Sequence, residues 1–495
     1  MFSAREDFRR QRRFNFFMRK FLISFLFVLA FSIDLFAQSG RVIVPVASPS
    51  PTDAESGSAK DLSVEQLFNE ANGYAKAKFA EYAQKKIPYT DNLYQVTLRE
   101  QRQLAAKYAA AAGARENLSG ADFYFLGMLH WTAENADGAG ENLRKFVASE
   151  NADAKKLQTT RFVLATVAAR RKNFDEAETL LADYLKNEPV KLNERARIET
   201  ELAAAYKENK DFARAAPHAE QAYAASKILF KDFGSRSRAL NEILGAGLNV
   251  SDIYASAGNR AKAEETLADL RRTAVTIVSI EIYYAAIDAN INYLIDTGRK
   301  ADALKMYRNV LDEVRKDFAS KPQQEDVVRR LKKREAQYKL LGESAPELQD
   351  IALWFPGAPQ SFANLRGKVV LLDFWATWCG PCIAAFPSLV EWQQNYKKDG
   401  FVVVGLTRFY EKVQNEKVDN SVEIANLKNF RVEKNLTYDF AVATSQTTQN
   451  AYGATGLPTT VLIDRKGIVR YIETGTSASR EADIRREIEK LLAEK

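Results

Sequence analysis

Residues that bind metals or form stabilising disulfides are scarce in this sequence. Its 495 residues include two cysteines, Cys379 and Cys382, and two histidines, His130 and His218. A structural zinc site takes about four ligands, usually cysteine pairs and histidines, and here both histidines lie far from the cysteines in the chain. A disulfide between residues so close in sequence stabilises a fold very little. We therefore expect no metal and no other cofactor, and we expect the cysteine pair to serve chemistry.

Basic tracts interleaved with aromatic residues, which mark nucleic-acid-binding surfaces, are missing beyond the N-terminus. The formal net charge of +7 suggests such a surface only until the charges are located. Residues 1–37 contain seven Lys/Arg and three acidic residues, and so account for +4 of that charge. We therefore expect no nucleic-acid partner.

The N-terminus has the pattern of a targeting segment. Its basic stretch ends at Lys20, the apolar run at residues 21–33 follows, and Ala37 is a candidate for the residue before a cleavage point. Such a run suits the apolar region of a signal peptide and is short for a membrane span of ~20 residues. Residues 1–37 are predicted to be a signal peptide, with an N-terminal membrane anchor as the alternative, and residues 38–62 a flexible leader. Either reading predicts export to the bacterial periplasm or cell envelope.

Residues 63–340 are predicted to form helices, because apolar residues recur there with the helical period and proline is rare. A capping box at residues 63–66 marks the expected start of the first helix. A short motif recurs five times at spacings of 38, 38, 48 and 40 residues. It contains Ala139, Ala177, Ala215, Ala263 and Ala303, and twelve residues before these stand Gly127, Ala165, Ala203, Ser251 and Ile291.

Four of the five preceding residues are small, which lets paired helices approach closely. The pattern resembles tetratricopeptide repeats, whose period is ~34 residues. We predict an all-α helical-repeat array that docks a protein or peptide, with a scaffold that has no partner as the alternative. Since each hairpin buries its apolar face against the next, we expect few contacts across the junction at residues 339–344.

From residue 344 to residue 495, strand-like apolar runs alternate with helical segments. The runs lie at residues 369–374, 401–406, 459–463 and 468–472. The first two flank a helix and predict a parallel crossover, whereas a turn signal at residues 464–467 joins the last two as an antiparallel hairpin. The chain is thus predicted to be multidomain, with the helical array followed by an α/β domain that has a mixed central sheet.

The stretch LDFWATWCGPC at residues 372–382 contains both cysteines. A Cys-x-x-Cys pair at the N-terminus of a helix is typical of a redox dithiol, since the helix end favours the thiolate. Cys379 is then the nucleophile and Cys382 the resolving residue, while Gly380 permits the turn and Pro381 suits the first helical turn. Burial on a strand would raise the pKa of Asp373, which could then accept the Cys382 proton. The alternative is an aspartate at a solvated strand end.

Residues 373–382 resemble the active-site stretch of thioredoxins, and residues 345–387 resemble the TlpA/ResA-like branch of that superfamily. The segment GLPTT at residues 456–460 resembles the family loop whose proline, here Pro458, is cis and faces the disulfide. The resemblance implies a thioredoxin fold and a catalytic role for Pro458. The client peptide is expected to contact Leu457 together with Trp378, Gly380 and Pro381.

Two positions bear on the kind of reaction. Several members of this branch carry a glutamate where this chain has Ala385, whereas its Gly-Pro dipeptide resembles the reducing members. The resemblance implies an exported thiol-disulfide reductase. Its clients would include apocytochrome c, and a membrane dithiol would donate the electrons. The alternatives are a thiol peroxidase of the peroxiredoxin type, which would have threonine in place of Ala376, and a non-enzymatic adaptor built on the repeats.

Overall fold

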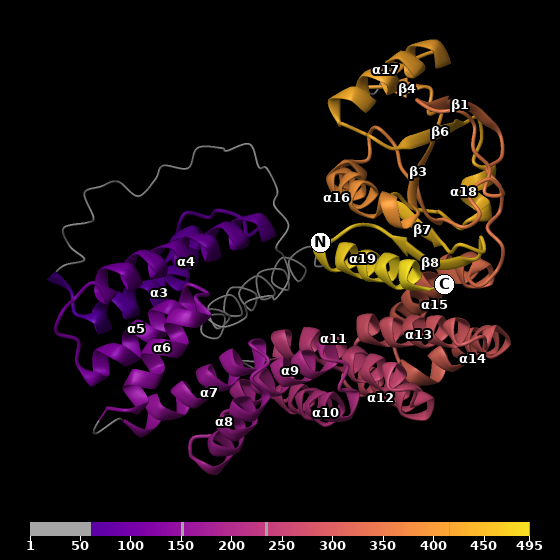
Figure 1. Ribbon diagram of the computed structural model, residues 1–495. Helices are drawn as coiled ribbons and strands as arrows, with labels where there is room; N and C mark the ends of the chain where they lie inside the picture. The colour runs from indigo at the N-terminus through magenta and orange to yellow at the C-terminus, as the bar shows by residue number, and fades with distance from the viewer. Residues whose placement is uncertain (1–60, 150–152, 233–235, 415, 495) are drawn as a thin grey trace, which may run out of the picture. The chain divides into compact units, whose positions relative to one another are not determined.

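The computed structural model describes residues 61–149, 153–232, 236–414 and 416–494 (Figure 1). The predicted signal or anchor at residues 1–37, and the leader up to residue 60, lie outside the described residues. Within the described part of the chain, no helix is both long and apolar enough to cross a membrane. The chain divides into two compact units, one ending at Thr266 and one beginning at Leu267.

The first unit is helical, as predicted. Its elements are α3 (Val64–Gln84), α4 (Asp91–Gly113), α5 (Gly120–Thr132), α6 (Ala136–Val147), α7 (Ala154–Arg170), α8 (Phe174–Lys186), α9 (Leu192–Glu208), α10 (Phe212–Leu229), α11 (Arg236–Ser256) and the first part of α12 (Arg260–Thr276). The capping box is confirmed at the start of α3. The Gln66 backbone N–H donates to Ser63 Oγ over 3.2 Å, and the Ser63 N–H donates to Gln66 Oε1 over 2.8 Å.

The five aligned motifs lie near the starts of α6, α8, α10, α12 and α14 (Lys300–Asp317), and their five alanines are fully buried. The small residues twelve positions upstream lie on the preceding helix of each pair, and two of them lie where that helix contacts the helix that contains the motif. A Cβ on Gly127 would lie only 2.7 Å from Leu143 Cγ, and Ser251 Oγ donates to the Ala263 carbonyl over 3.1 Å. The helical hairpins are therefore confirmed, while their assignment as tetratricopeptide repeats stays a prediction.

The second unit combines the last helices of the array with the α/β domain. Its further helices are α13 (Ile280–Asp296), α14, α15 (Lys321–Leu340), α16 (Gly380–Tyr396), a 3₁₀ turn (Lys397–Asp399), α17 (Asn420–Glu433), α18 (Thr447–Ala451) and α19 (Ala478–Ala493). Its strands are β1 (Ile351–Phe355), β2 (Val369–Phe374), β3 (Phe401–Arg408), β4 (Lys412–Val413), β5 (Glu416–Lys417), β6 (Asp439–Ala443), β7 (Thr459–Ile463) and β8 (Val469–Thr474).

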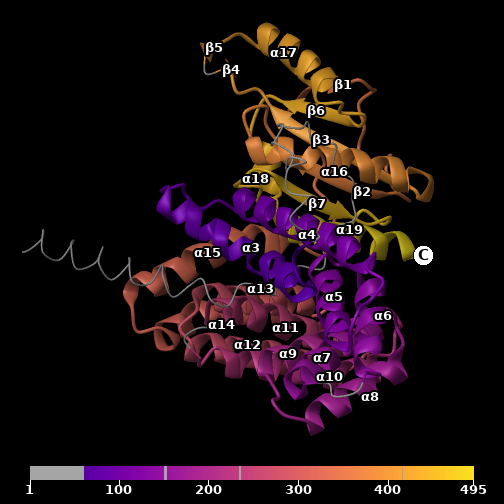
Figure 2. The same cartoon turned by 90° about the vertical axis from the view of Figure 1, so that its left-hand side faces the viewer.

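Six of these strands form one mixed sheet in the order β1-β6-β3-β2-β7-β8 (Figure 1 and Figure 2). The predicted parallel pair β2–β3 and the antiparallel hairpin β7–β8 are confirmed. All six residues of β2 are buried, because the strand lies inside the sheet. One face of the sheet packs against apolar residues of α16, α17 and α19. The predicted fold class is confirmed.

The expectation of few contacts at residues 339–344 is wrong. The backbone N–H of Gly342 donates to the Val469 carbonyl over 2.8 Å, and the Val469 N–H donates to the Glu343 carbonyl over 2.9 Å. Two buried side chains of α15, Arg334 and Gln337, also donate hydrogen bonds to the α/β part of the unit. The physical reason is that α15 buries polar groups against the sheet, whereas its many charged residues suggest a solvated helix.

We therefore predict that a fragment of residues 344–495 is less stable than one of residues 279–495, which starts at the Ser279 cap of α13. Removing residues 279–343 deletes three hydrogen bonds to β8, made by Arg334, Gly342 and Glu343, each worth about 1 kcal/mol, so we expect a loss of about 3 kcal/mol. Urea unfolding followed by circular dichroism measures the difference. Equal midpoints and slopes for the two fragments would contradict the packing of α15 seen here.

Candidate active site

The predicted nucleophile, Cys379, lies between the end of strand β2 and the start of helix α16. β2 ends at Phe374, Trp375 continues the buried chain, and Cys379 is the N-cap residue of α16. The backbone N–H of Cys382 donates to Cys379 Sγ over 3.2 Å. The unpaired N–H groups and the dipole at this helix end favour negative charge on Cys379 once it is reduced.

The two cysteines form a disulfide, with their Cα atoms 5.3 Å apart. Both cysteines are buried, and Cys379, with 4% of the residue exposed, is slightly more exposed than Cys382, with 1%. Pro381 occupies the first turn of α16, where a missing N–H costs nothing. The order of exposure agrees with Cys379 as the attacking residue and Cys382 as the resolving one.

The residues predicted to contact a client surround the disulfide. Trp378, Gly380 and Pro381 are exposed, and the Trp378 side chain is 60% exposed despite its apolar character. Leu457 is partly buried and packs against the apolar cluster that contains both cysteines. An exposed aromatic side chain beside a reactive group is suited to contact a partner.

Pro458 belongs to the same end of the sheet. Its peptide bond with Leu457 is cis, as the resemblance implies. The next residue, Thr459, pairs with Phe374 at the end of β2, directly before the loop that leads to Cys379. The register therefore places Pro458 at the edge of the sheet from which the cysteine loop begins.

Asp373 lies under α16 and is not at a solvated strand end. Asp373 follows Val369 and Leu371 along β2 at intervals of two residues, so its side chain lies on their face of the sheet, where both belong to the apolar cluster around the cysteines. Only 2% of Asp373 is exposed, and burial raises its pKa to about 7. A carboxyl group that titrates near neutral pH is suited to exchange a proton with a thiol.

Two polar side chains beside Asp373 are not identified by the sequence. Gly405 of β3 is in register with Asp373, and a Cβ on it would lie 2.9 Å from Trp375 Nε1 and 3.4 Å from the Tyr438 ring. Burial, and then the Asp373 charge, raise the pKa of Tyr438 well above its usual value. Among the described residues, neither Trp375 Nε1 nor the Tyr438 hydroxyl has a hydrogen-bond partner. No motif marks Tyr438, which lies in the ordinary-looking stretch LTYDF.

The sequence also does not identify Tyr410 and Glu423, which lie close to Trp378 and to the loop after β3. The rings of Trp378 and Tyr410 meet edge to face, with centroids 5.3 Å apart. The buried Glu423 carboxylate of α17 accepts the backbone N–H groups of Tyr410 and Glu411 over 2.9 to 3.2 Å. Glu423 thereby fixes the loop after β3. Its helical position resembles that of a solvated residue, so the sequence offers no signal for this role.

The described residues contain no group of three or more His, Cys, Asp or Glu that could hold a metal ion. The two histidines lie in α5 and α10 of the first compact unit. His218 is held there between the carboxylates of Glu199 and Glu178, at 2.6 and 3.0 Å. The reactive groups described at the site are the Asp373 carboxyl group and the sulfur atoms of Cys379 and Cys382.

Comparison with known proteins relates this domain to several redox proteins. A family model described as Redoxin matches residues 340–488. The thiol-disulfide oxidoreductase ResA of Geobacillus thermodenitrificans is 31% identical over 153 residues, which cover 30% of this chain and 78% of that protein. Protein DipZ of Mycobacterium tuberculosis is 37% identical over 137 residues, which cover 27% of this chain and 18% of DipZ.

Among solved structures, a putative thiol:disulfide interchange protein DsbE from Chlorobium tepidum is 29% identical. The match covers 31% of this chain and 98% of that chain, with a TM-score of 0.27. Because this TM-score is low, we base the relationship on the sequence matches and not on the structural similarity.

Proposed function

Because this chain belongs, through its C-terminal domain, to the ResA family of thiol-disulfide oxidoreductases, we propose that it works outside the cytosol as a reductase of client-protein disulfides. The observation that carries the proposal is the placement of Cys379 as the N-cap of α16, with Cys382 one turn along and the buried Asp373 on the sheet face below. Export is supported by the targeting pattern of residues 1–37 and by the use of the only two cysteines as a single pair.

The reaction begins when the Cys379 thiolate attacks one sulfur of a client disulfide. A bond forms between Cys379 Sγ and that sulfur, the client S–S bond breaks, and the second client sulfur leaves as a thiolate that takes up a proton. Cys382 then gives its proton to Asp373 and attacks Cys379 Sγ. This step forms the Cys379–Cys382 disulfide and breaks the mixed disulfide, so that the first client sulfur leaves as a thiolate and takes up a proton.

Two electrons have then passed from the Cys379–Cys382 dithiol to the client. A dithiol donor must return two electrons to the enzyme. A membrane dithiol protein fits this role, because the enzyme is proposed to work outside the cytosol. An oxidised Cys-x-x-Cys-His segment of apocytochrome c is the client that we propose. The two cysteines of such a segment are separated by two residues, so its disulfide closes a small loop that Cys379 at the start of α16 can attack.

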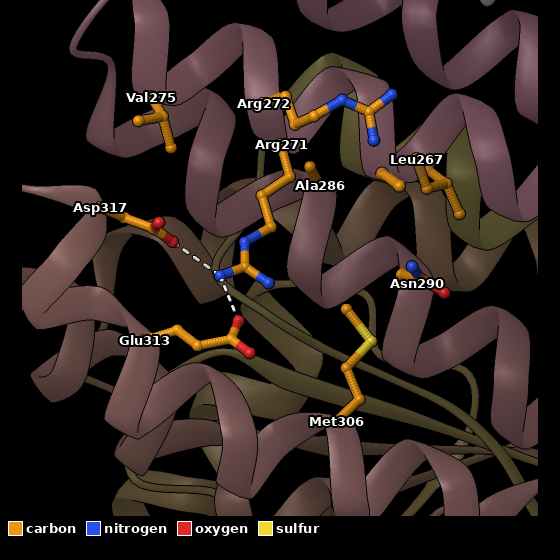
Figure 3. Close-up of a pocket in the computed structure, with 10 residues that line it drawn as sticks. Leu267, Arg271, Arg272, Val275, Ala286, Asn290, Met306, Glu313 and Asp317 are labelled. Atoms are coloured by element: carbon orange, nitrogen blue, oxygen red, sulfur yellow. Dashed lines mark hydrogen bonds and ion pairs between the residues drawn. The ribbon is translucent and has the colours of Figure 1, made fainter.

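The helical region is proposed to dock the client. A hollow of about 440 Å³ opens between α12, α13 and α14, in the same compact unit as the dithiol (Figure 3). Its lining includes the apolar side chains of Val275 and Met306. The Arg271 guanidinium lies 2.6 Å from a carboxylate oxygen of both Glu313 and Asp317, and Arg272, also in the lining, pairs with Asp269 over 3.4 Å. An apolar wall with paired charges suits a neutral, extended client segment.

The proposal predicts that the chain from residue 38 onward reduces a Cys-x-x-Cys-His peptide disulfide faster than dithiothreitol alone, with dithiothreitol as the final donor. The same protein should consume hydrogen peroxide no faster than free dithiol does, because Ala376 lacks the hydroxyl that a peroxidase of the peroxiredoxin type would use. Met306→Glu should weaken turnover of the peptide and leave that of a small aromatic disulfide unchanged.

The direction of the reaction is tested by equilibrating the protein with glutathione redox buffers. A reduction potential near that of thioredoxin, about −270 mV, is expected for a reductase. A potential above about −150 mV, close to that of strong oxidants, would overturn the reductase proposal. Rapid peroxide consumption would favour the peroxidase, and no turnover of any substrate would favour the adaptor.

A further inference from the structure

Helix α15 directs two buried polar side chains toward the α/β part of its unit. Arg334 is 9% exposed, forms an ion pair with Asp288 of α13 over 3.0 Å, and donates to the Ile472 carbonyl of β8 over 2.9 Å. Its guanidinium also donates to Gln337 Oε1 over 2.5 Å. The amide oxygen of Gln337 is thus held from one side, and its NH₂ group is directed away from Arg334.

The Gln337 NH₂ group bonds to the start of the loop at residues 453–459 and to Thr474 of β8, whose hydroxyl lies beside the other end of that loop. Gln337 Nε2 donates to the Gly453 carbonyl over 2.9 Å and lies 3.4 Å from Thr474 Oγ1. Thr474 Oγ1 lies 3.1 Å from Thr459 Oγ1, which donates to the Gly456 carbonyl over 2.7 Å. A chain of hydrogen bonds therefore runs from α15 to the peptide group that precedes Leu457.

The backbone of the loop lies directly against α15. Gly453 has φ of +60°, and a Cβ on it would lie 3.0 Å from both Ala336 Cβ and Gln337 Cγ. Only glycine adopts this conformation at such close approach without strain. Gly453 of the loop is therefore packed tightly against Ala336 and Gln337 of α15. Gln337 itself is buried, with 2% of the residue exposed.

We propose that Gln337 is a positioning residue for the exchange reaction, by which the last helix of the helical region holds Leu457 and Pro458 in the geometry that receives a client. The inference rests on the proposed reduction of client disulfides. It follows from two placements described above: Leu457 packs against the cluster that contains the cysteines, and Thr459 pairs with the end of β2. The helical region then contributes to the shape of the catalytic site as well as to docking.

The proposal separates client binding from thiol chemistry. The Gln337 side chain is hydrogen-bonded to Arg334, Gly453 and Thr474, all of which lie outside α16, the helix whose N-terminus determines the reactivity of Cys379. Loss of the Gln337 N–H donors should therefore weaken productive binding of an extended peptide. It should leave the pH dependence of Cys379 alkylation and the reduction potential unchanged. A residue with a merely structural role would affect stability alone.

The test uses the chain from residue 38 onward and an oxidised Cys-x-x-Cys-His peptide. Gln337→Glu keeps an oxygen that accepts from Arg334 and removes the donor to Gly453. We expect kcat/KM for the peptide to fall about tenfold, mainly through KM, with turnover of a small aromatic disulfide unchanged. Thr474→Val removes the next hydroxyl in the chain of hydrogen bonds and should also raise KM for the peptide. Thr474→Ser keeps that hydroxyl and should retain the wild-type KM.

Gln158→Leu is the matched control. Gln158 is also buried, and its amide donates to the Tyr184 and Asn187 carbonyls within the first compact unit over 2.7 and 2.6 Å. It should lower stability without altering peptide KM. Wild-type peptide kinetics in Gln337→Glu and Thr474→Val would overturn the inference, as would equal losses for peptide and small disulfide. A wild-type protein that reduces neither substrate would instead overturn the proposed function.

Discussion

Replacing Cys382 by serine is expected to stop turnover after the first half of the exchange and to trap the client on Cys379. The Cys379 thiolate still attacks the client, because its helix-end environment does not depend on the Cys382 sulfur. Resolution then fails, since a serine hydroxyl does not attack a disulfide at neutral pH. A stable mixed disulfide should accumulate, visible by mass spectrometry and on non-reducing gels.

Cys379→Ser is the matched control for this trap. It removes the proposed nucleophile at the N-cap of α16 and should abolish both turnover and the mixed disulfide. In the reduced wild-type protein, iodoacetamide near neutral pH should label Cys379 before Cys382, because the effect of the helix dipole is strongest in the first turn. Trapping by Cys379→Ser instead of Cys382→Ser, or earlier labelling of Cys382, would reverse the assigned roles.

The parts of the site that the sequence predicts correctly depend on local signals. The N-cap position of Cys379, the capping box at Ser63 and the β7–β8 hairpin each depend on a few neighbouring residues. The same holds for the burial of Asp373, because the strand around it is apolar throughout. Local chemistry of this kind is read directly from the order of residues.

The parts that the sequence misses depend on partners distant in the chain. β1 and β6 are largely apolar, but they pair with each other, with Phe355 opposite Phe440, so the partner of each strand lies far along the chain. Gln337 lies in a helix with many charged residues and bonds to Gly453, 116 residues further on. Burial of such a side chain depends on tertiary packing, which no local pattern reveals.

Asp373→Asn is expected to raise the stability of the oxidised protein at pH 8 by up to about 4 kcal/mol. Burial raises the pKa of Asp373 from 3.8 to about 7, and each pKa unit corresponds to about 1.4 kcal/mol. Between pH 4 and pH 7 the unfolded carboxyl group is ionised while the folded one still binds a proton. Wild-type stability therefore falls as the pH rises through this window, and the full cost is present above pH 7.

The same substitution should slow disulfide exchange on the order of 10²-fold, because asparagine cannot accept the Cys382 proton. Asp399→Asn, at an exposed position of the same domain, should change neither quantity. Urea unfolding of the oxidised proteins from pH 4 to pH 8 isolates the carboxyl group, since disulfide-bonded cysteines do not titrate. The curves of wild type and Asp373→Asn should converge at pH 4 and separate toward pH 8. If the two curves of unfolding free energy against pH are parallel and the exchange rates are equal, burial does not raise the pKa of Asp373 and Asp373 does not accept the Cys382 proton. Another group would then have to accept that proton.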